Sequence, residues 1–530
     1  MATLLFLGAS VSQVPAIRYA RSSGYRVVAV DGDPSAVGFS DADVCINVDF
    51  TDVESVVAVV RTLGVEGVLA VSSDRAVQPA AEIAHALGLP GIGVDVARAM
   101  TDKTVMRALL AAAEVPQPRH AVLTRDSDVG AVAETIPLPA VLKPADSGGQ
   151  RGLFLIEEPA DVVYRLGETL SFSQSGRAML EEYVAGTELN GIMVVRGGEP
   201  TLLTLSDRLR PPGIGFGVGW IHLYPSALER DVIDRARDVA FTAVRALGLR
   251  DGIAFPQLIA DGADVRLVEI AARIAAGQMA DLVRFGTGIE LFDVAIAQAL
   301  GRPVLDEFVT PTSQRPIAIR FLTASPGVLP LGTVAAIEGL DEVRSSPGVL
   351  AAGLYFEAGA TITPVQVDAD RRGYVVATAE TADAALRLAD SAAQKLVVRT
   401  IPHRRAFRQA RVLVPIAGAA LAAAAAAVAL VAFDGGIRPR LVSDTIRGRG
   451  AFLQVRYAFN EPVRALLLVN GKAATAVSPL RKSGALLWQR QRGRGSVQLA
   501  IEGTDRSGRR AIVRLIRARD AASGRHPVAT

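Results

Sequence analysis

The stretch LPAVLKPADSGGQRGLFLI, residues 138–156, decides how this chain folds. An apolar strand is expected to end at Lys143, and a glycine-rich loop with Ser147, Gly148, Gly149 and Gly152 leads into a second apolar strand. Glycine lets backbone N–H groups approach an anion closely, and a lysine at a strand end adds positive charge. The pattern therefore predicts a phosphate-holding loop. The GxxxxGK[ST] spacing is absent, and a hairpin with a plain glycine turn is the alternative for the loop alone.

A second lysine, Lys103, stands near the start of the amphipathic segment MTDKTVMRALLAAAEV, residues 100–115. The N-terminus of a helix favours anions because its unpaired N–H groups and dipole carry partial positive charge. Only five of the 57 basic residues are lysines, and Lys103 and Lys143 are the only two before residue 395. Both rare lysines thus lie at positions that favour an anion.

Acidic and amide side chains follow in two further segments. MLEEYVAGTELNG, residues 179–191, places Glu181, Glu182 and Glu188 on strand and turn, suited to accept hydrogen bonds from amine and hydroxyl groups. FPQLIADGADVRLVEI, residues 255–270, places Gln257 and Glu269 on two strands joined by a turn. Both side-chain oxygens could face one Mg²⁺ ion, which keeps water and phosphate in its other positions.

In this order the segments resemble the ATP-grasp superfamily, over about residues 1–400. The resemblance implies a Rossmann-like domain, a split nucleotide clamp and a closing subdomain, with ATP and Mg²⁺ (or Mn²⁺) as cofactors. It assigns phosphate binding to Lys103 and Lys143 and the mobile loop to residues 147–152. For the remaining contacts it implies Glu181 and the Val184 backbone on the adenine side, Glu188 on the ribose, Gln257 and Glu269 on the metal, and Arg273 on substrate or phosphate. Glu182 stays a candidate for nucleotide binding on its residue type and position.

Two positions depart from the family pattern. Gln257 stands where the family has a metal-binding acid, and Ala271 stands where it has an asparagine. A neutral amide still coordinates Mg²⁺, although with less charge, whereas alanine cannot coordinate it. These departures bear on catalysis more than on ATP binding.

The resemblance implies an ADP-forming ligase that joins a small carboxylate to an amine (or thiol) through an acylphosphate. Substrate contacts are expected in SDRLRPPGIGFGVGWIHLYPS, residues 206–226, from Asp207, Arg208 and His222, with a structural histidine as the alternative for His222. One competing hypothesis is a catalytically weakened ATP-binding sensor coupled to the C-terminal region. Another is a biotin-carboxylase-type enzyme with a separate carrier, because no biotin-attachment sequence is present.

The fold class is predicted to be α/β and α+β. TLLFLGASVSQVPAIRYARSSGYRVVAVDGDP, residues 3–34, reads as strand, glycine turn, helix and strand, which is typical of a parallel sheet. It lacks the spaced glycines of a dinucleotide fingerprint, so NAD is not expected. The single cysteine, Cys45, is expected in a core strand. The predicted parts are a Rossmann-like domain (1–95), an ATP-grasp domain (96–310), its closing subdomain (311–400), a basic juxtamembrane segment (401–411), a transmembrane helix (412–433) and a β-sandwich (441–520).

Residues 412–433 contain no charge and as a helix would span roughly 33 Å. Arginines crowd the N-terminal flank at 404, 405, 408 and 411, so the positive-inside rule predicts a single-pass anchor in the cell membrane. The ATP-grasp region would be cytoplasmic and the C-terminal domain extracytoplasmic. Half of the segment is alanine, and a buried or soluble alanine-rich helix is the alternative.

Residues 434–530 contain 19 Lys and Arg against 6 Asp and Glu, a net charge of +13. This excess could bind an anionic envelope component or a lipid headgroup. A solvated arginine-rich surface is an equal alternative. Nucleic acid is not an expected partner of a domain outside the cell, and a homodimer is left open.

Overall fold

The computed structural model describes residues 1–210 and 218–401, and beyond them the backbone of six strands between residues 441 and 514. The chain divides into two compact units, Met1–Phe407 and Arg408–Thr530. Most of the predicted juxtamembrane segment 401–411 and the whole predicted transmembrane segment 412–433 lie outside the described residues. No helix of the described part is both long enough and apolar enough to cross a membrane.

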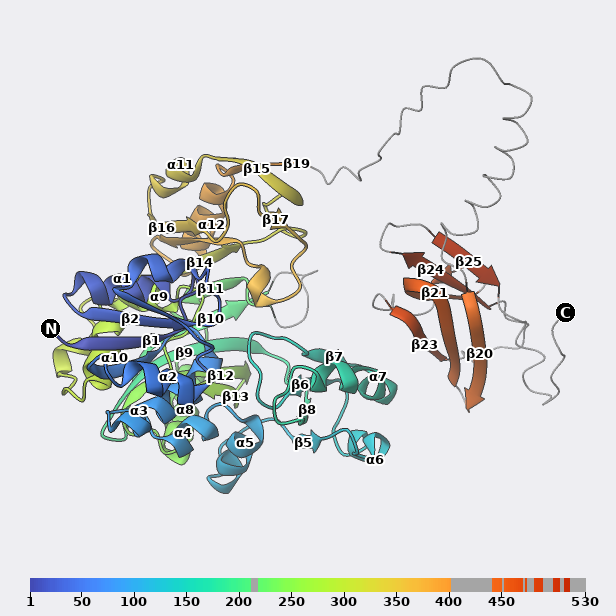
Figure 1. Cartoon of the computed structure of the whole chain (residues 1–530), viewed down its shortest axis with the longest axis horizontal. Coiled ribbons are helices and arrows are strands. Elements are labelled where there is room, and N and C mark those ends of the chain that lie inside the picture. Colours follow the sequence, from blue (N-terminus) through green and yellow to red (C-terminus); the bar gives the residue numbers. More distant parts are fainter. Residues whose placement is uncertain are drawn as a thin grey trace, which may run out of the picture. The chain divides into compact units, whose positions relative to one another are not determined.

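The first unit begins with the segment drawn in blue in Figure 1, where β1 and β2 are labelled. This segment contains a parallel sheet in the order β3-β2-β1-β4. Its strands are β1 (Thr3–Leu7), β2 (Arg26–Asp31), β3 (Val44–Asn47) and β4 (Val65–Ala70), and its helices are α1 (Val14–Ser22), α2 (Val53–Val60), α3 (Val77–Leu87) and α4 (Val94–Ala99). Leu5 and Val28 pack with residues of α2 on one face, whereas Leu4 and Val27 pack with residues of α1 on the other. The apolar runs are therefore buried on both sides, as predicted. Cys45, however, lies exposed on edge strand β3, so the core expectation was wrong.

A small antiparallel sheet carries the glycine-rich loop. It has the order β5-β8-β6-β7, built from β5 (His120–Leu123), β6 (Ala140–Pro144), β7 (Phe154–Ile156) and β8 (Ala178–Glu182). Helix α5 (Lys103–Ala112) precedes it, and α6 (Val129–Ala133) and α7 (Pro159–Leu170) belong to it. The loop joins β6 to β7, so Lys143 lies near the end of β6, one residue before its last.

The largest sheet has eight strands in the order β13-β12-β9-β10-β11-β14-β18-β16. Their bounds are β9 (Thr187–Arg196), β10 (Glu199–Leu209), β11 (Ile221–Tyr224), β12 (Gly252–Asp261), β13 (Asp264–Ala271), β14 (Ile317–Leu322), β16 (Val349–Leu354) and β18 (Gly373–Thr378). Helices α8 (Arg230–Ala246), α9 (Met279–Thr287), α10 (Leu291–Ala299), α11 (Leu340–Arg344) and α12 (Ala382–Ala393) belong to this part. Three strands after residue 310 continue the sheet begun before it, so the predicted boundary at 310 is crossed by hydrogen-bonded strands.

A three-stranded sheet, β17-β15-β19, completes the first unit with β15 (Gly332–Glu338), β17 (Thr361–Ile362) and β19 (Val397–Ile401). Short 3-10 turns stand at Val37–Asp41, Asp74–Ala76, Asp306–Phe308 and Asp368–Asp370. In the second unit the described strands form one six-stranded sheet, in which β21 pairs with β20, β22, β23 and β24. They are β20 (Leu441–Arg449), β21 (Phe452–Val469), β22 (Lys472–Ala473), β23 (Arg481–Gln489), β24 (Leu499–Asp505) and β25 (Arg510–Arg514). A two-sheet sandwich stays a prediction.

Candidate active site

A cavity of about 860 Å³ lies where the antiparallel sheet β5-β8-β6-β7, the eight-stranded sheet and the N-terminal domain meet. Most of the residues that the sequence singled out line it. These are Lys103, Lys143, Ser147, Gly148, Gly149, Glu181, Glu182, Val184, Glu188, Arg208, His222, Gln257, Glu269 and Arg273. Segments more than 150 residues apart in sequence thus supply one site.

Lys103 is the first residue of α5, and Asp102 caps that helix by accepting the backbone N–H of Thr104. The Lys103 ammonium is buried, donates a hydrogen bond to the Ser147 carbonyl at 3.0 Å and pairs with Glu269 at 3.1 Å. Burial disfavours the charge, but Glu269, with Asp74 and Glu181, outweighs burial and raises the pKa of Lys103. A permanent cation therefore joins the glycine loop to the predicted metal acid.

Lys143 shares Glu181 with an arginine that the sequence reading missed. Glu181 lies 2.7 Å from the Lys143 ammonium and 2.9 Å from Nε of Arg107, and all three side chains are buried. Although burial opposes its charge, the two cations lower the pKa of Glu181 to about 2. Burial, with the Arg107 charge adding to it, lowers the pKa of Lys143 despite Glu181. Glu181 thus pairs with Lys143, the lysine predicted to bind phosphate, a role that its predicted adenine contact did not include.

The glycine loop closes against the N-terminal domain. Gly149 has φ of +69°, which favours glycine. A Cβ on Gly148 would lie 2.6 Å from Oδ2 of Asp74, so only glycine fits this approach without movement. Gly152 does not line the cavity; a Cβ there would meet the Phe172 ring at 2.7 Å, so its smallness serves packing.

The predicted nucleoside-side acids are held by arginines. Glu188 accepts hydrogen bonds from Arg208 and Arg210. Glu182 accepts the backbone N–H of Arg119 at 2.9 Å and pairs with Arg266. Glu188, Arg208 and Arg210 line the cavity together, so a ribose hydroxyl would meet an ion-pair cluster rather than an isolated carboxylate.

Gln257 and Glu269 lie directly opposite each other on β12 and β13, as the hairpin predicted. Burial is outweighed by Lys103 and Lys143, which lower the pKa of Glu269 and keep it ionised. Ala271 lies opposite Phe255 and offers no ligand atom. No group of three His, Cys, Asp or Glu side chains suited to a metal occurs within the described residues. Among these residues, Glu269 is the one carboxylate that the predicted metal site contains.

Arg273 is buried and reaches into the N-terminal domain. Its guanidinium pairs with Asp74 at 2.7 Å through both Nε and Nη2. Asp74 comes from the 3-10 turn after β4, 199 residues earlier in the chain. Both nitrogens contact the same carboxylate oxygen, Oδ1, and these two contacts orient the guanidinium at the cavity wall.

The structure brings His222 but not Asp207 to the cavity. Asp207 accepts hydrogen bonds from Ser226 at 2.5 Å and the Ala227 backbone at 3.0 Å on the other face of β10, so it does not line this cavity and its substrate role stays a prediction. Neighbouring strand residues point to opposite faces, and Arg208 takes the cavity face. Burial, then the charges of Arg208 and Arg371, lowers the pKa of His222 well below its usual value, so the ring is neutral.

The segment after residue 350 supplies cavity residues that the sequence reading missed. Tyr355, Asp368 and Arg371 line the cavity together with the two lysines. The Arg371 guanidinium stacks over the Phe321 ring at 4.2 Å and donates to the Asp368 carbonyl at 3.0 Å. Asp368 also accepts the Gly219 N–H at 3.0 Å. The closing subdomain is therefore part of the site and not only a cover.

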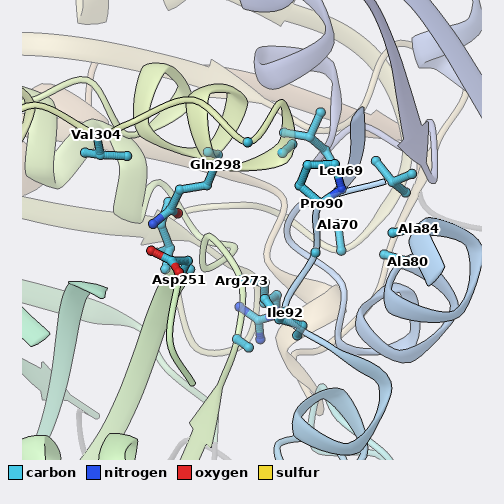
Figure 2. Close-up of a pocket in the computed structure, with 18 of the residues that line it drawn as sticks. Leu69, Ala70, Ala80, Ala84, Pro90, Ile92, Asp251, Arg273, Gln298 and Val304 are labelled. Carbon is cyan, nitrogen blue, oxygen red and sulfur yellow. The ribbon is translucent and has the colours of Figure 1, made fainter. Parts of the chain in front are cut away.

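A second cavity, of about 760 Å³, adjoins Arg273 on the other side (Figure 2). The labelled side chains of Leu69, Ala70, Ala80, Ala84, Pro90 and Ile92 give it an apolar wall. Opposite them, Asp251 accepts the Gly197 N–H at 3.0 Å and Gln298 donates to the Val195 carbonyl at 2.9 Å. These polar atoms are used within the protein, so the charged groups suited to chemistry are concentrated in the first cavity.

Two family models match long stretches of the first unit. A model of the carbamoyl-phosphate synthase L chain ATP-binding domain matches residues 102–307, and a model of L-amino acid ligase C-terminal domain 2 matches residues 320–400. The D-alanine–D-alanine ligase of Desulforudis audaxviator is 30% identical over 265 residues, which cover 47% of this chain and 78% of that protein. The chain belongs to the ATP-grasp superfamily.

Solved structures confirm the predicted ATP-grasp fold. An L-amino acid ligase from Bacillus licheniformis superposes with a TM-score of 0.64 at 19% identity, covering 76% of this chain and 99% of that one. Phosphoribosylglycinamide synthetase from Anaerococcus prevotii gives 0.62 at 18% identity, covering 76% and 100%. The uncharacterized protein y4rH of Sinorhizobium fredii is 29% identical over 302 residues, 56% of this chain. The chain spans 61% of that relative's length.

Proposed function

We propose that this chain is an ATP- and Mg²⁺-dependent ligase that joins a small carboxylate to an amine and releases ADP. The observation that carries the proposal is the pair of buried ammonium groups, Lys103 and Lys143, which face one cavity beside the glycine loop. Lys103 and Lys143 pair with Glu269 and Glu181, but Arg107 shares Glu181, so these three buried cations outnumber their two carboxylates. Buried cations are costly unless anions balance them, and a polyphosphate would balance the remaining positive charge. The names of relatives support the reaction class, since they include a D-alanine–D-alanine ligase and carbamoyl phosphate synthase large chains.

The residues fit the expected metal in type. Glu269 and Gln257 would hold Mg²⁺ or Mn²⁺ through side-chain oxygens, leaving positions for phosphate and water. When bound, the ion would neutralise charge on the phosphate oxygens. Lys103 would hold both Glu269 and the loop in place through the contacts that it already makes.

In the proposed reaction a substrate carboxylate oxygen attacks the γ-phosphorus of ATP, and the bond to the bridging oxygen breaks to release ADP. The amine nitrogen then attacks the carbonyl carbon of the acylphosphate; inorganic phosphate leaves, and the nitrogen loses a proton. Lys143 and Arg273 would neutralise the charge on the transferred group, which needs positioning more than covalent help. The neutral ring of His222 adds no charge that would repel an ammonium substrate.

The test is ADP and phosphate release by the purified full-length chain with MgATP and a panel of amino acids and other small carboxylates and amines. Release that requires both a carboxylate and an amine is the expected result. The second candidate is a nucleotide-binding sensor with weakened catalysis, which Ala271 at the metal site favours. ATP binding without ADP release across the panel would support the sensor. A biotin-carboxylase-type activity and a homodimer stay predictions.

We also propose that residues 412–433 anchor the chain in the cell membrane, with the ATP-grasp region in the cytoplasm. The support comes from sequence alone: an uncharged run of 22 residues behind four arginines. After carbonate extraction, we expect the full chain to stay in the membrane fraction and a chain that ends at residue 411 to be released into the soluble fraction. Release of both chains to the same extent would refute the anchor.

A further inference from the structure

Three neighbouring strands of the eight-stranded sheet place three oxygen-bearing side chains in one row. Gln257 on β12 lies opposite Glu269 on β13, and on its other side it lies opposite Asn190 on β9. Directly opposed residues of antiparallel strands share a face, with Cβ atoms about 4.5–5.5 Å apart. All three residues line the first cavity, so Asn190 continues the row of the two predicted metal ligands.

The Asn190 side chain is buried, with 3% of its surface exposed, and its Oδ1 has no hydrogen-bond partner. Its amide nitrogen is engaged instead, at 3.3 Å from Nδ1 of His222. A buried polar atom without a partner costs about 1–3 kcal/mol. An unpartnered carbonyl oxygen in a ligand cavity therefore points to a partner that arrives with the ligand.

The neighbours of this oxygen indicate what the partner is. A carbonyl oxygen can only accept, so its partner is a cation or a hydrogen-bond donor. Gln257 and Glu269 add two more oxygens beside it, and hard divalent cations prefer oxygen ligands. The row carries a single negative charge, from Glu269, so phosphate oxygens must supply the remaining charge.

We propose that Asn190 is a third protein ligand of the divalent cation, supplying through Oδ1 the oxygen that Ala271 cannot. The inference rests on the proposed function, because the cation enters together with the nucleotide. In this proposal the neutral ligand Asn190 comes from β9, whereas Ala271, which departs from the family pattern, lies on β13.

The experiment measures Mn²⁺ binding to the full-length chain by electron paramagnetic resonance, with the non-hydrolysable analogue AMP-PNP bound. Asn190→Leu keeps the branched side-chain shape and replaces the amide oxygen and nitrogen by methyl groups, and we expect Mn²⁺ affinity to fall about 10- to 100-fold. Asn190→Asp adds a charge and should tighten binding. Thr204→Val is the matched control, because Thr204 also has a buried oxygen without a partner but does not line the cavity.

AMP-PNP affinity is measured first in EDTA, which separates the two levels of the proposal. A wild-type chain that binds no AMP-PNP would refute the proposed function itself. Nucleotide binding with equal Mn²⁺ affinity in wild type and Asn190→Leu would overturn only the role of Asn190. Weaker metal-free AMP-PNP binding in Asn190→Leu would also overturn it, because the oxygen would then serve the nucleotide. If Asn190→Leu does not fold, Asn190→Asp decides: unchanged Mn²⁺ affinity refutes the inference.

Discussion

Arg107 offers a direct test of how the buried charges of the site are held. Its guanidinium donates to Glu181 at 2.9 Å and to the carbonyl oxygens of Leu267 and Val268 at 3.1 and 2.6 Å. Only 1% of the Arg107 surface is exposed, and these hydrogen bonds link α5 to β8 and β13. Arg107→Met removes the charge and all these donors while retaining an apolar side chain.

The expected loss follows from the pKa of Glu181. Arg107 and Lys143 hold it at about 2, against an ordinary 4.5, which corresponds to roughly 3 kcal/mol of stabilisation. Arg107 makes the larger of the two contributions. Two carbonyl groups also lose a donor, at about 1 kcal/mol each. We therefore expect the free energy of unfolding to fall by about 3–4 kcal/mol, in the range for a broken buried ion pair.

The assay is urea unfolding at pH 7 and at lower pH, followed by the fluorescence of buried Trp220 in a Trp488→Phe background, because the chain has two tryptophans. Because the folded-state pKa of Glu181 lies below its unfolded value, its stabilisation is complete above pH 4.5 and fades as the pH falls toward 2. The gap between wild type and Arg107→Met should therefore narrow in acid. Arg177→Met, which breaks a partly exposed pair with Asp102, is the control and should cost about 1 kcal/mol or less. Equal losses in both variants, or a gap that does not change with pH, would refute the reasoning.

Two other predictions concern the ligand site. Lys143→Gln should weaken AMP-PNP binding at least about 100-fold in isothermal titration calorimetry, because a buried cation at the phosphate position is lost. Lys395→Gln, whose parent side chain bonds to Ser346 away from the cavity, should bind like wild type, and similar affinities in both variants would remove the phosphate assignment. Asp74→Asn loosens Arg273 and should lower kcat for ADP release by roughly 10- to 100-fold with little change in the KM for ATP. An unchanged kcat would show that Asp74 does not position Arg273.

Part of what the sequence reading missed was present in local patterns. Arg107 stands at the helical spacing of the buried residues Lys103, Met106 and Leu110, so an inward-facing arginine was predictable. Strand alternation likewise places the Asp207 side chain on the face away from the cavity, because its neighbour Arg208 faces the cavity. The pairing of Arg273 with Asp74 has no local signal, because 199 residues separate the two partners.

The sequence by itself determined the strands, the glycine loop, the two rare lysines and the Gln257–Glu269 hairpin. Each of these depends on residues close together in the chain, through apolar alternation, turn chemistry and helix capping. Only the tertiary structure decided which carboxylate meets which cation and that Asn190 lies in one row with Gln257 and Glu269. The reason is physical: strand order and register bring distant segments together, and the energy of a buried charge depends on partners that local sequence does not specify.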